Sequence, residues 1–141
     1  MDATPRRNLA WALLESLWSR GDEGPVRAVA APDFRHQLSH TAEAVDLDGY
    51  CALVAGFRSA FDPIDLLPHR TLVDGDRIVA HYSLTGDHVG AFLGVEATGT
   101  VLWVPAMTFM TFRDEGAGPR LVRQASLTDF LSVQRQLRQA S

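Results

Sequence analysis

The sequence predicts an α+β fold in which helices come first and an antiparallel sheet follows. In the first half of the chain, apolar residues recur every three to four positions, which is the spacing of one helix face. From Pro63 onward they alternate, as they do along a strand. The length of 141 residues suits one domain with one core. We therefore expect a single domain over residues 1–141.

Two helices are expected at the start of the chain. The segment NLAWALLESLWSRGD repeats leucine at every fourth position, Trp11 and Trp18 widen its apolar stripe, and Gly21 ends it. A shorter helix, EGPVRAVA, stops before Pro32, because a residue that precedes proline is pushed out of the α region. Both helices are expected to pack on one face of the sheet.

A third helix is expected after DLDGY, where Asp46 or Asp48 can cap its first turn. Its apolar face is made of Tyr50, Leu53, Val54, Phe57, Ala60 and Phe61. The single cysteine, Cys51, excludes an internal disulfide and fits a reducing cytoplasm. Because Cys51 lies on an apolar helical face, we interpret it as a buried structural thiol and not as a nucleophile.

Four strands and a terminal helix are expected in the second half. IDLLPHRTLV and RIVAHYSLTGDH flank the turn DGD, which is a hairpin signal. GTVLWVPAMTFMTFR is a longer strand, in which Pro105 implies a bulge or an edge position. PRLVRQASLT is the last strand, and FLSVQRQLR follows it as a helix. Together they predict an antiparallel meander that ends in a helix.

The longest of these strands is apolar on both faces. One alternating set contains Trp103, Met107 and Phe109, and the other contains Leu102, Val104, Met110 and Phe112. An antiparallel sheet with one face in water would instead alternate apolar with polar residues. We therefore expect helices to cover one face and a second subunit to cover the other, in a homodimer or a homotetramer.

Charge and hydropathy exclude several classes of function. The net charge is -4, and no basic cluster could neutralise a row of phosphates, so nucleic acid is not an expected partner. No apolar run approaches the ~18 residues that a membrane span requires. Glu15 interrupts the apolar stretch near the N-terminus, which is therefore not a secretory signal. We expect a cytoplasmic protein that does not bind membranes.

Asp129, in SLTDFLSVQRQL, lies where the last strand gives way to the terminal helix. Aspartate is a favourable N-cap, and the residues after it carry a helical apolar stripe. Asp129 also shares strand parity with the apolar residues Leu121, Ala125 and Leu127. A carboxylate that opens onto an apolar interior loses hydration and becomes a better proton carrier near neutral pH. From the residues alone, Asp129 can be a helix cap, a proton carrier or both.

Four segments lie in a fixed order between Leu9 and Leu137: APDFRH, VDGDRIVAHYSLTGDHVGAFLGVEATG, FRD and TDFLSVQRQL. In this order and spacing they resemble the SnoaL-like polyketide cyclase family, a branch of the nuclear transport factor 2-like superfamily. The resemblance implies a cone-shaped, curved antiparallel sheet with the N-terminal helices on its concave face. It also implies an enzyme of polyketide biosynthesis that closes a ring by intramolecular aldol condensation, with neither a metal nor an organic cofactor.

The same resemblance nominates Asp129 as the general acid/base, because it precedes Gln136 and Leu137 by the spacing found in the family. Asp129 would remove a proton alpha to a carbonyl of a polyketide-like substrate. The resulting enolate would attack a ketone or aldehyde of the same molecule, and the protonated carboxyl would return its proton to the new alkoxide. The pocket would supply orientation, which accounts for much of the rate in such a step.

His36, in PDFRH, matches a position that often faces the cavity in the family, and we expect it to assist Asp129. The other expected substrate contacts are Trp18, Tyr50, Phe57, His81, His88, Trp103, Met107 and Phe109. Aromatic and methionine side chains at these spacings can equally form plain core. His36 and His40 have the spacing of a metal pair, but no third ligand is evident, so no metal is expected. His69 is expected to face solvent.

Two alternatives remain open. The fold could serve a hydroxylase, an isomerase or an epoxide-opening enzyme of natural-product biosynthesis, and epoxide opening would want Asp87 as a second inward acid. Alternatively, an accessory protein could hold a small apolar ligand without turning it over. The absence of a strong polar partner for Asp129 favours the accessory protein, whereas the spacing from Asp129 to Gln136 favours the enzyme.

Overall fold

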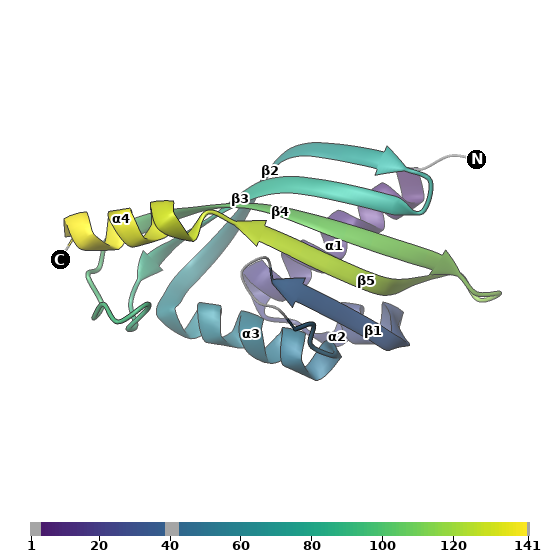
Figure 1. Cartoon of the computed structure of the whole chain (residues 1–141), viewed down its shortest axis with the longest axis horizontal. Coiled ribbons are helices and arrows are strands. Elements are labelled where there is room, and N and C mark those ends of the chain that lie inside the picture. The colour runs from purple at the N-terminus through teal and green to yellow at the C-terminus, as the bar shows by residue number, and fades with distance from the viewer. Residues whose placement is uncertain (1–3, 39–42, 141) are drawn as a thin grey trace.

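The computed structural model describes residues 4–38 and 43–140, in which a curved sheet packs against helices from the first half of the chain (Figure 1). The helices are α1 (Thr4–Arg20), α2 (Gly24–Val29), α3 (Leu47–Ala60) and α4 (Phe130–Ala140). The strands are β1 (Ala30–Leu38), β2 (Phe61–Asp74), β3 (Arg77–His88), β4 (Val101–Asp114) and β5 (Pro119–Thr128). Within these ranges, no helix has the length and hydropathy needed to cross a membrane. The predicted α+β class is confirmed, and the predicted elements occur in the expected order with one additional strand, β1, between α2 and α3.

The sheet has the strand order β1-β5-β4-β3-β2. β2 to β5 form the predicted antiparallel meander, whereas β1 pairs parallel to β5, so the sheet is mixed. β1 was not predicted from the sequence. Its segment AAPDFRHQL gives no clear alternation, because only Ala31, Phe34 and His36 are buried. Its parallel partner β5 lies near the other end of the chain, so no local sequence pattern indicates this pairing either.

One face of the sheet forms the core. α1 packs across β2 and β3, while α3 contacts β1 and β2. The inward side chains of β3 and β4 are buried: Ile78, Ala80, Tyr82, Leu84, Leu102, Val104, Ala106, Thr108, Met110 and Phe112. Burial stabilises by about 25 cal/mol for each Å² of apolar surface, so this layer supplies the main driving force for folding.

Pro105 lies inside β4, where a proline requires an explanation. Its pairing with Ser83 of β3 is regular. On the other side of β4, pairing with β5 begins only at Ala106, opposite Thr128 at the end of β5. Pro105 therefore lies at a local edge, where the N–H that it lacks would point past the end of β5. Of the two predicted explanations, the edge position is confirmed.

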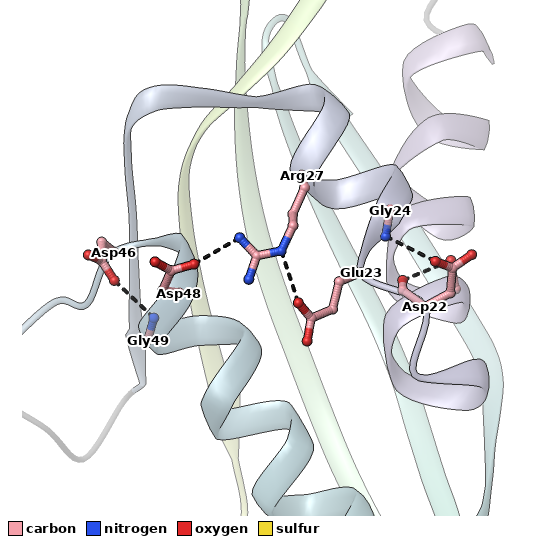
Figure 2. A network of polar contacts seen from close by, with 8 residues as sticks. Asp22, Glu23, Gly24, Arg27, Asp46, Asp48 and Gly49 are labelled. Atoms are coloured by element: carbon pink, nitrogen blue, oxygen red, sulfur yellow. Dashed lines mark hydrogen bonds and ion pairs between the residues drawn. The ribbon is translucent and has the colours of Figure 1, made fainter.

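A cap and an ion-pair network fix the start of α3 (Figure 2). Asp46 accepts a hydrogen bond of 2.9 Å from the backbone N–H of Gly49. Arg27 of α2 donates through Nη1 to Asp48 (2.8 Å) and through Nε to Glu23 (2.9 Å), so it ties α2 to α3. Of the two predicted caps, Asp46 is the one that acts. The network matters for function because α3 forms one wall of the interior.

Cys51 lies in the core as a free thiol, 2 % exposed. Burial raises the pKa of its thiol, which disfavours the reactive thiolate. The nearby acidic side chain of Glu23 raises the pKa further, whereas Arg27 lowers it. The prediction of a buried structural thiol is therefore confirmed.

Replacing the cap of α3 tests how far its start depends on one side chain. We expect Asp46→Ala to lower the free energy of unfolding by about 1 kcal/mol, because it leaves an N-terminal N–H of α3 without an acceptor. Asp46→Ser removes the same charge but keeps an oxygen that can cap, so we expect it to be nearly neutral. Urea denaturation of both variants measures the difference. Equal losses in the two would show that charge, and not capping, is what counts.

Candidate functional site

An interior cavity of about 20 Å³ lies between the inner face of the sheet and the helices α1 and α3. Its lining residues come from six elements: Trp18, His36, Leu38, Leu53, Phe57, Tyr82, Leu84, Val104, Ala106, Ser126 and Thr128. Apolar residues make up most of the wall, and a few polar side chains converge on it. That combination is typical of a small-molecule site in a protein of this size.

His36 is the polar group most deeply placed in this cavity, 1 % exposed. Its ring stacks on Tyr50, with centroids 4.3 Å apart. The amide nitrogen of Gln124 lies 3.3 Å from His36 Nδ1. An amide N–H only donates, so Nδ1 accepts and the proton of the neutral ring lies on Nε2. Burial lowers the pKa of His36 from 6.5 to about 4, so the ring is neutral at neutral pH.

Two buried nitrogens next to this cavity lack a hydrogen-bond partner. Within the described part of the chain, neither His36 Nε2 nor Trp18 Nε1 has one. The Trp18 indole lies near the Tyr50 hydroxyl without making a hydrogen bond of acceptable geometry to it. Burial raises the pKa of Tyr50 to about 12, although Gln124 and Trp18 act to lower it. A buried donor without an acceptor is costly, and two of the three such nitrogens in the described residues belong to side chains that line this cavity, whereas the third, His88 Nε2, lies outside it.

A second polar group of the site is fully satisfied. The Tyr82 hydroxyl and Thr108 Oγ1 are 2.7 Å apart, and Thr108 Oγ1 and Ser126 Oγ are 3.0 Å apart. The three side chains come from β3, β4 and β5 and lie on the inner face. This chain of hydroxyls fixes Tyr82 and Ser126 in the cavity wall. Its hydrogen bonds leave a ligand little to gain there, in contrast to the two unpaired nitrogens.

Asp129 does not lie on the wall of this cavity. Its side chain is exposed and accepts a hydrogen bond of 3.0 Å from the backbone N–H of Ser132, so it caps α4. It lines a depression on the outer face of the sheet beside His81, Met107 and Leu127. The predicted cap is confirmed, and the prediction that Asp129 opens onto an apolar interior is wrong.

A β-bulge explains why strand parity misplaced Asp129. Thr111 of β4 pairs with Arg123, but the next residue, Phe112, pairs with Leu121. Val122 is therefore an extra residue in β5, and the alternation changes phase there. Leu121 faces the core, whereas Leu127 and Asp129 are exposed on the other side. Parity with Leu121 was therefore no guide to the direction of Asp129.

Three further predicted substrate contacts lie on the outer face. Trp103, Met107 and Phe109 are 52 %, 37 % and 41 % exposed, so the prediction that they line the interior is wrong. His81 is also on this face, with its ring 5.1 Å from that of His69. The inward set of β4 is the opposite one, which contains Thr108 at its centre. The rule that aromatic residues point inward misassigned the two faces.

The remaining predicted contacts are Trp18, Phe57, Tyr50 and His88, and His69 was expected to face solvent. Trp18 and Phe57 line the cavity as predicted, and Tyr50 supports it from beneath His36. His88 is buried beside Phe61, and its Nδ1 lies 2.9 Å from Thr98 Oγ1, outside the cavity wall. His69 is exposed, as predicted, and its Nε2 lies 2.8 Å from Ser83 Oγ.

Sequence reasoning missed Gln124, Ser126 and Thr128. They alternate along β5 on its inner face, and that alternation was the available signal. As for metal, no group of three or more histidine, cysteine or acidic side chains in the described ranges could hold an ion. His40, the predicted spacing partner of His36, lies outside the described residues.

Comparisons with known proteins support this architecture. The profile of the SnoaL-like polyketide cyclases matches residues 8–137. AclR, a candidate hydroxylase from Streptomyces galilaeus, has 21% identity and a TM-score of 0.84, with 98% of each chain covered. A candidate SnoaL-like polyketide cyclase from Jannaschia sp. CCS1 has 27% identity and a TM-score of 0.81 over 95% of this chain and 92% of that one. IdmH, a candidate polyketide cyclase from Streptomyces antibioticus, has 21% identity and a TM-score of 0.80 over 94% and 97%.

A search of curated proteins finds no match. The family profile nevertheless covers almost the whole chain, and solved structures of the same fold cover it from end to end. The fold and the order of segments that the sequence predicted are therefore those of a known family. This chain belongs to the SnoaL-like polyketide cyclase family, with the nuclear transport factor 2-like fold.

Proposed function

We propose that this protein closes a ring of a polyketide-type intermediate by a cofactor-independent intramolecular aldol reaction in the interior cavity. The observation that carries the proposal is the unpaired Nε2–H of neutral His36, a buried side chain in a mostly apolar cavity wall to which Trp18, with its own unpaired N–H, also contributes. Family membership supplies the class of reaction. The enzyme would thus belong to secondary metabolism.

The two N–H groups suit the charge that an aldol reaction develops. Loss of a proton alpha to a carbonyl puts negative charge on the enolate oxygen, and the attack then moves charge to an alkoxide oxygen. Donors that are already oriented in a low-dielectric site stabilise such an oxygen more than water does. His36 is better suited to this in its neutral form, because the ring donates through Nε2 without carrying a charge into the cavity. The apolar wall would hold the rest of the ligand in a reactive conformation.

Asp129 is the proposed proton carrier in this reaction, on the strength of the family spacing to Gln136. Its neighbour Thr128 lines the cavity, so the backbone of Asp129 lies at the cavity's edge. Its carboxylate would have to turn from the N–H of Ser132 toward that edge, exchanging a capping hydrogen bond for the substrate. It would take the alpha proton from carbon and deliver it to the alkoxide, so no net proton is consumed.

A ligand-binding protein is the strongest rival. None of the described residues that line the cavity carries a carboxylate, which favours binding without turnover. Epoxide opening is less favoured, because Asp87 belongs to the outward-facing set of β3 and supplies no second inward acid. A hydroxylase activity is suggested only by what AclR is called. AclR resembles this chain in its fold.

Replacement of Asp129 separates chemistry from capping. We expect Asp129→Asn and Asp129→Ser to lower turnover at least ~100-fold, since a positioned acid/base contributes that much. Both side chains can still cap α4, so the free energy of unfolding should change by less than about 0.5 kcal/mol. The measurement is absorbance during reaction with a panel of anthraquinone-type keto esters. Full turnover by both variants would assign Asp129 to capping alone.

Replacement of His36 tests the donor directly. We expect His36→Phe, which keeps a flat ring on Tyr50, to lower kcat by ~100-fold or more, as loss of one oxyanion donor does. His69→Phe is the matched control, because His69 is exposed on the other face. The same absorbance assay reports both. If the two variants turn over substrate equally, the donor role of His36 is wrong.

The burial of neutral His36 also predicts a pH dependence of stability. Its pKa is about 4 in the folded protein and 6.5 ordinarily, so the unfolded chain takes up the proton first as the pH falls. The free energy of unfolding is therefore highest above pH 6.5. It falls by roughly 3 kcal/mol as the pH falls toward 4. Unfolding of the wild type and His36→Phe across this range isolates the effect. Parallel curves would contradict it.

We further propose that a second copy of this chain covers the outer face of the sheet. The outward set of β4 from Val101 to Thr111 contains no charged residue, and Trp103 and Phe109 are prominent in it. Four strands of about twelve residues make a face of roughly 19 by 40 Å. That area is close to the roughly 800 Å² per partner of a standard interface.

A charge placed on this face should separate the copies. We expect the wild type to sediment as a dimer or tetramer and Phe109→Arg to sediment as a monomer, because the interface would have to bury an unpaired guanidinium. Leu93→Arg adds the same charge at an exposed leucine outside the sheet and should leave the assembly intact. A monomeric wild type at tens of micromolar would refute the interface.

A further inference from the structure

A second cavity of about 10 Å³ adjoins the first on the inner face of the sheet. The two share three lining residues, Phe57, Leu84 and Val104. Each cavity has room for about one water molecule, whereas small-molecule sites enclose roughly 300–1,000 Å³. A flat multi-ring ligand therefore enters only if part of the shared wall moves.

Phe57 is the member of that wall that can move. Leu84 and Val104 are buried and belong to paired strands in the middle of the sheet. Phe57 lies on α3, is half-buried, and has a long side chain with two rotatable bonds. The wall between the cavities therefore consists of two fixed residues and one aromatic ring that can swing.

The ring of Phe57 lies in an aromatic cluster at one end of the sheet. Its centroid is 5.4 Å from Trp18 in the cavity, 5.1 Å from Phe92 and 6.5 Å from Phe130. Phe92 belongs to the connection between β3 and β4, and Phe130 begins α4. That connection and α4 lie at the same end of the sheet (Figure 1). Phe57 thus separates the donors inside from two surface segments outside.

The connection that carries Phe92 is joined to the end of α3, because the backbone N–H groups of Val89 and Gly90 both donate to the carbonyl oxygen of Ala60. Phe92 and Val95 exchange two backbone hydrogen bonds of 2.9 Å within it. Leu93 between them has a φ of 49°, a left-handed conformation that costs a residue with a side chain about 1 kcal/mol or more. The loop tip is therefore closed by its own backbone hydrogen bonds, and Phe92 packs from it onto Phe61 with ring centroids 4.9 Å apart.

We infer that Phe57 is a gate and the residue that sets the size of ligand the interior accepts. When its ring swings toward the side of Phe92, the two cavities join into one slot between α3 and the sheet. The inner end of the slot holds the N–H groups of His36 and Trp18, and the outer end is lined by apolar Phe61, Ile64 and Leu102. A flat aromatic ketone would enter this slot with its oxygens inward. The ligand class rests on the proposed function, whereas the gate itself does not.

The test uses Trp18 as a reporter inside the slot. In a Trp11→Phe, Trp103→Phe background it is the one tryptophan left, and its quenching by acrylamide and by 1,8-dihydroxyanthraquinone can be followed. We expect Phe57→Leu to raise the rate of anthraquinone association at least tenfold and Phe57→Trp to lower it at least tenfold. Phe92→Leu, which shortens a side chain that packs on Phe57 without itself lining either cavity, should also raise it. Phe109→Leu on the outer face is the matched control and should leave it unchanged.

Acrylamide quenching of Trp18 should follow the same order, and thermal unfolding verifies that each variant is folded. Equal rates in Phe57→Leu and Phe57→Trp would overturn the gate, and so would the absence of binding in every variant. Binding that follows the expected order without turnover of any keto ester would leave the gate standing and overturn the proposed function. The two inferences therefore fail in different experiments.

Discussion

The parallel pairing of β1 with β5 is the constraint on which the site depends. It sets His36 directly opposite Gln124, so that one amide both holds the imidazole and determines which nitrogen carries the proton. The two residues are 88 positions apart in the chain. Without this pairing, β1 would be an exposed segment and His36 an ordinary surface histidine. The donor in the cavity is thus a product of topology and not of any local motif.

The burial of His36 with an unpaired N–H lowers the stability of the fold. An unpaired buried donor costs about 1–3 kcal/mol, and the desolvated imidazole adds a pH-dependent cost below its ordinary pKa. A phenylalanine at position 36 would stack on Tyr50 and avoid both costs. Polar groups that destabilise a fold in this way are found where binding or catalysis uses them. The same reasoning does not extend to Tyr82, Thr108 and Ser126, because their hydroxyls satisfy one another.

The sequence was sufficient for those features that have a local cause. The period of apolar residues predicted the meander and its helices, Asp46 was one of two predicted caps, and an edge position was one of two explanations predicted for Pro105. It was insufficient where the cause is non-local. β1 is a strand only because β5 is beside it, and Asp129 faces outward only because the bulge at Val122 shifts the alternation. Both errors concern the same strand, β5, so both affected residues that were predicted to form the site.

The assignment of the two sheet faces failed for a deeper reason. A pattern argument sends aromatic residues inward and polar residues outward, whereas β4 does the reverse near its centre, with Thr108 inside and Met107 and Phe109 outside. Each inversion is costly in an isolated chain: the inner one leaves polar groups out of water, and the outer one leaves apolar area in it. The hydrogen bonds of Thr108 to Tyr82 and Ser126 relieve the first, and an uncharged apolar surface would relieve the second. Since the two faces belong to the same strands, the proposed second copy on the outer face would also stiffen the wall behind the cavity, which would leave α3 and its Phe57 as the side that can move.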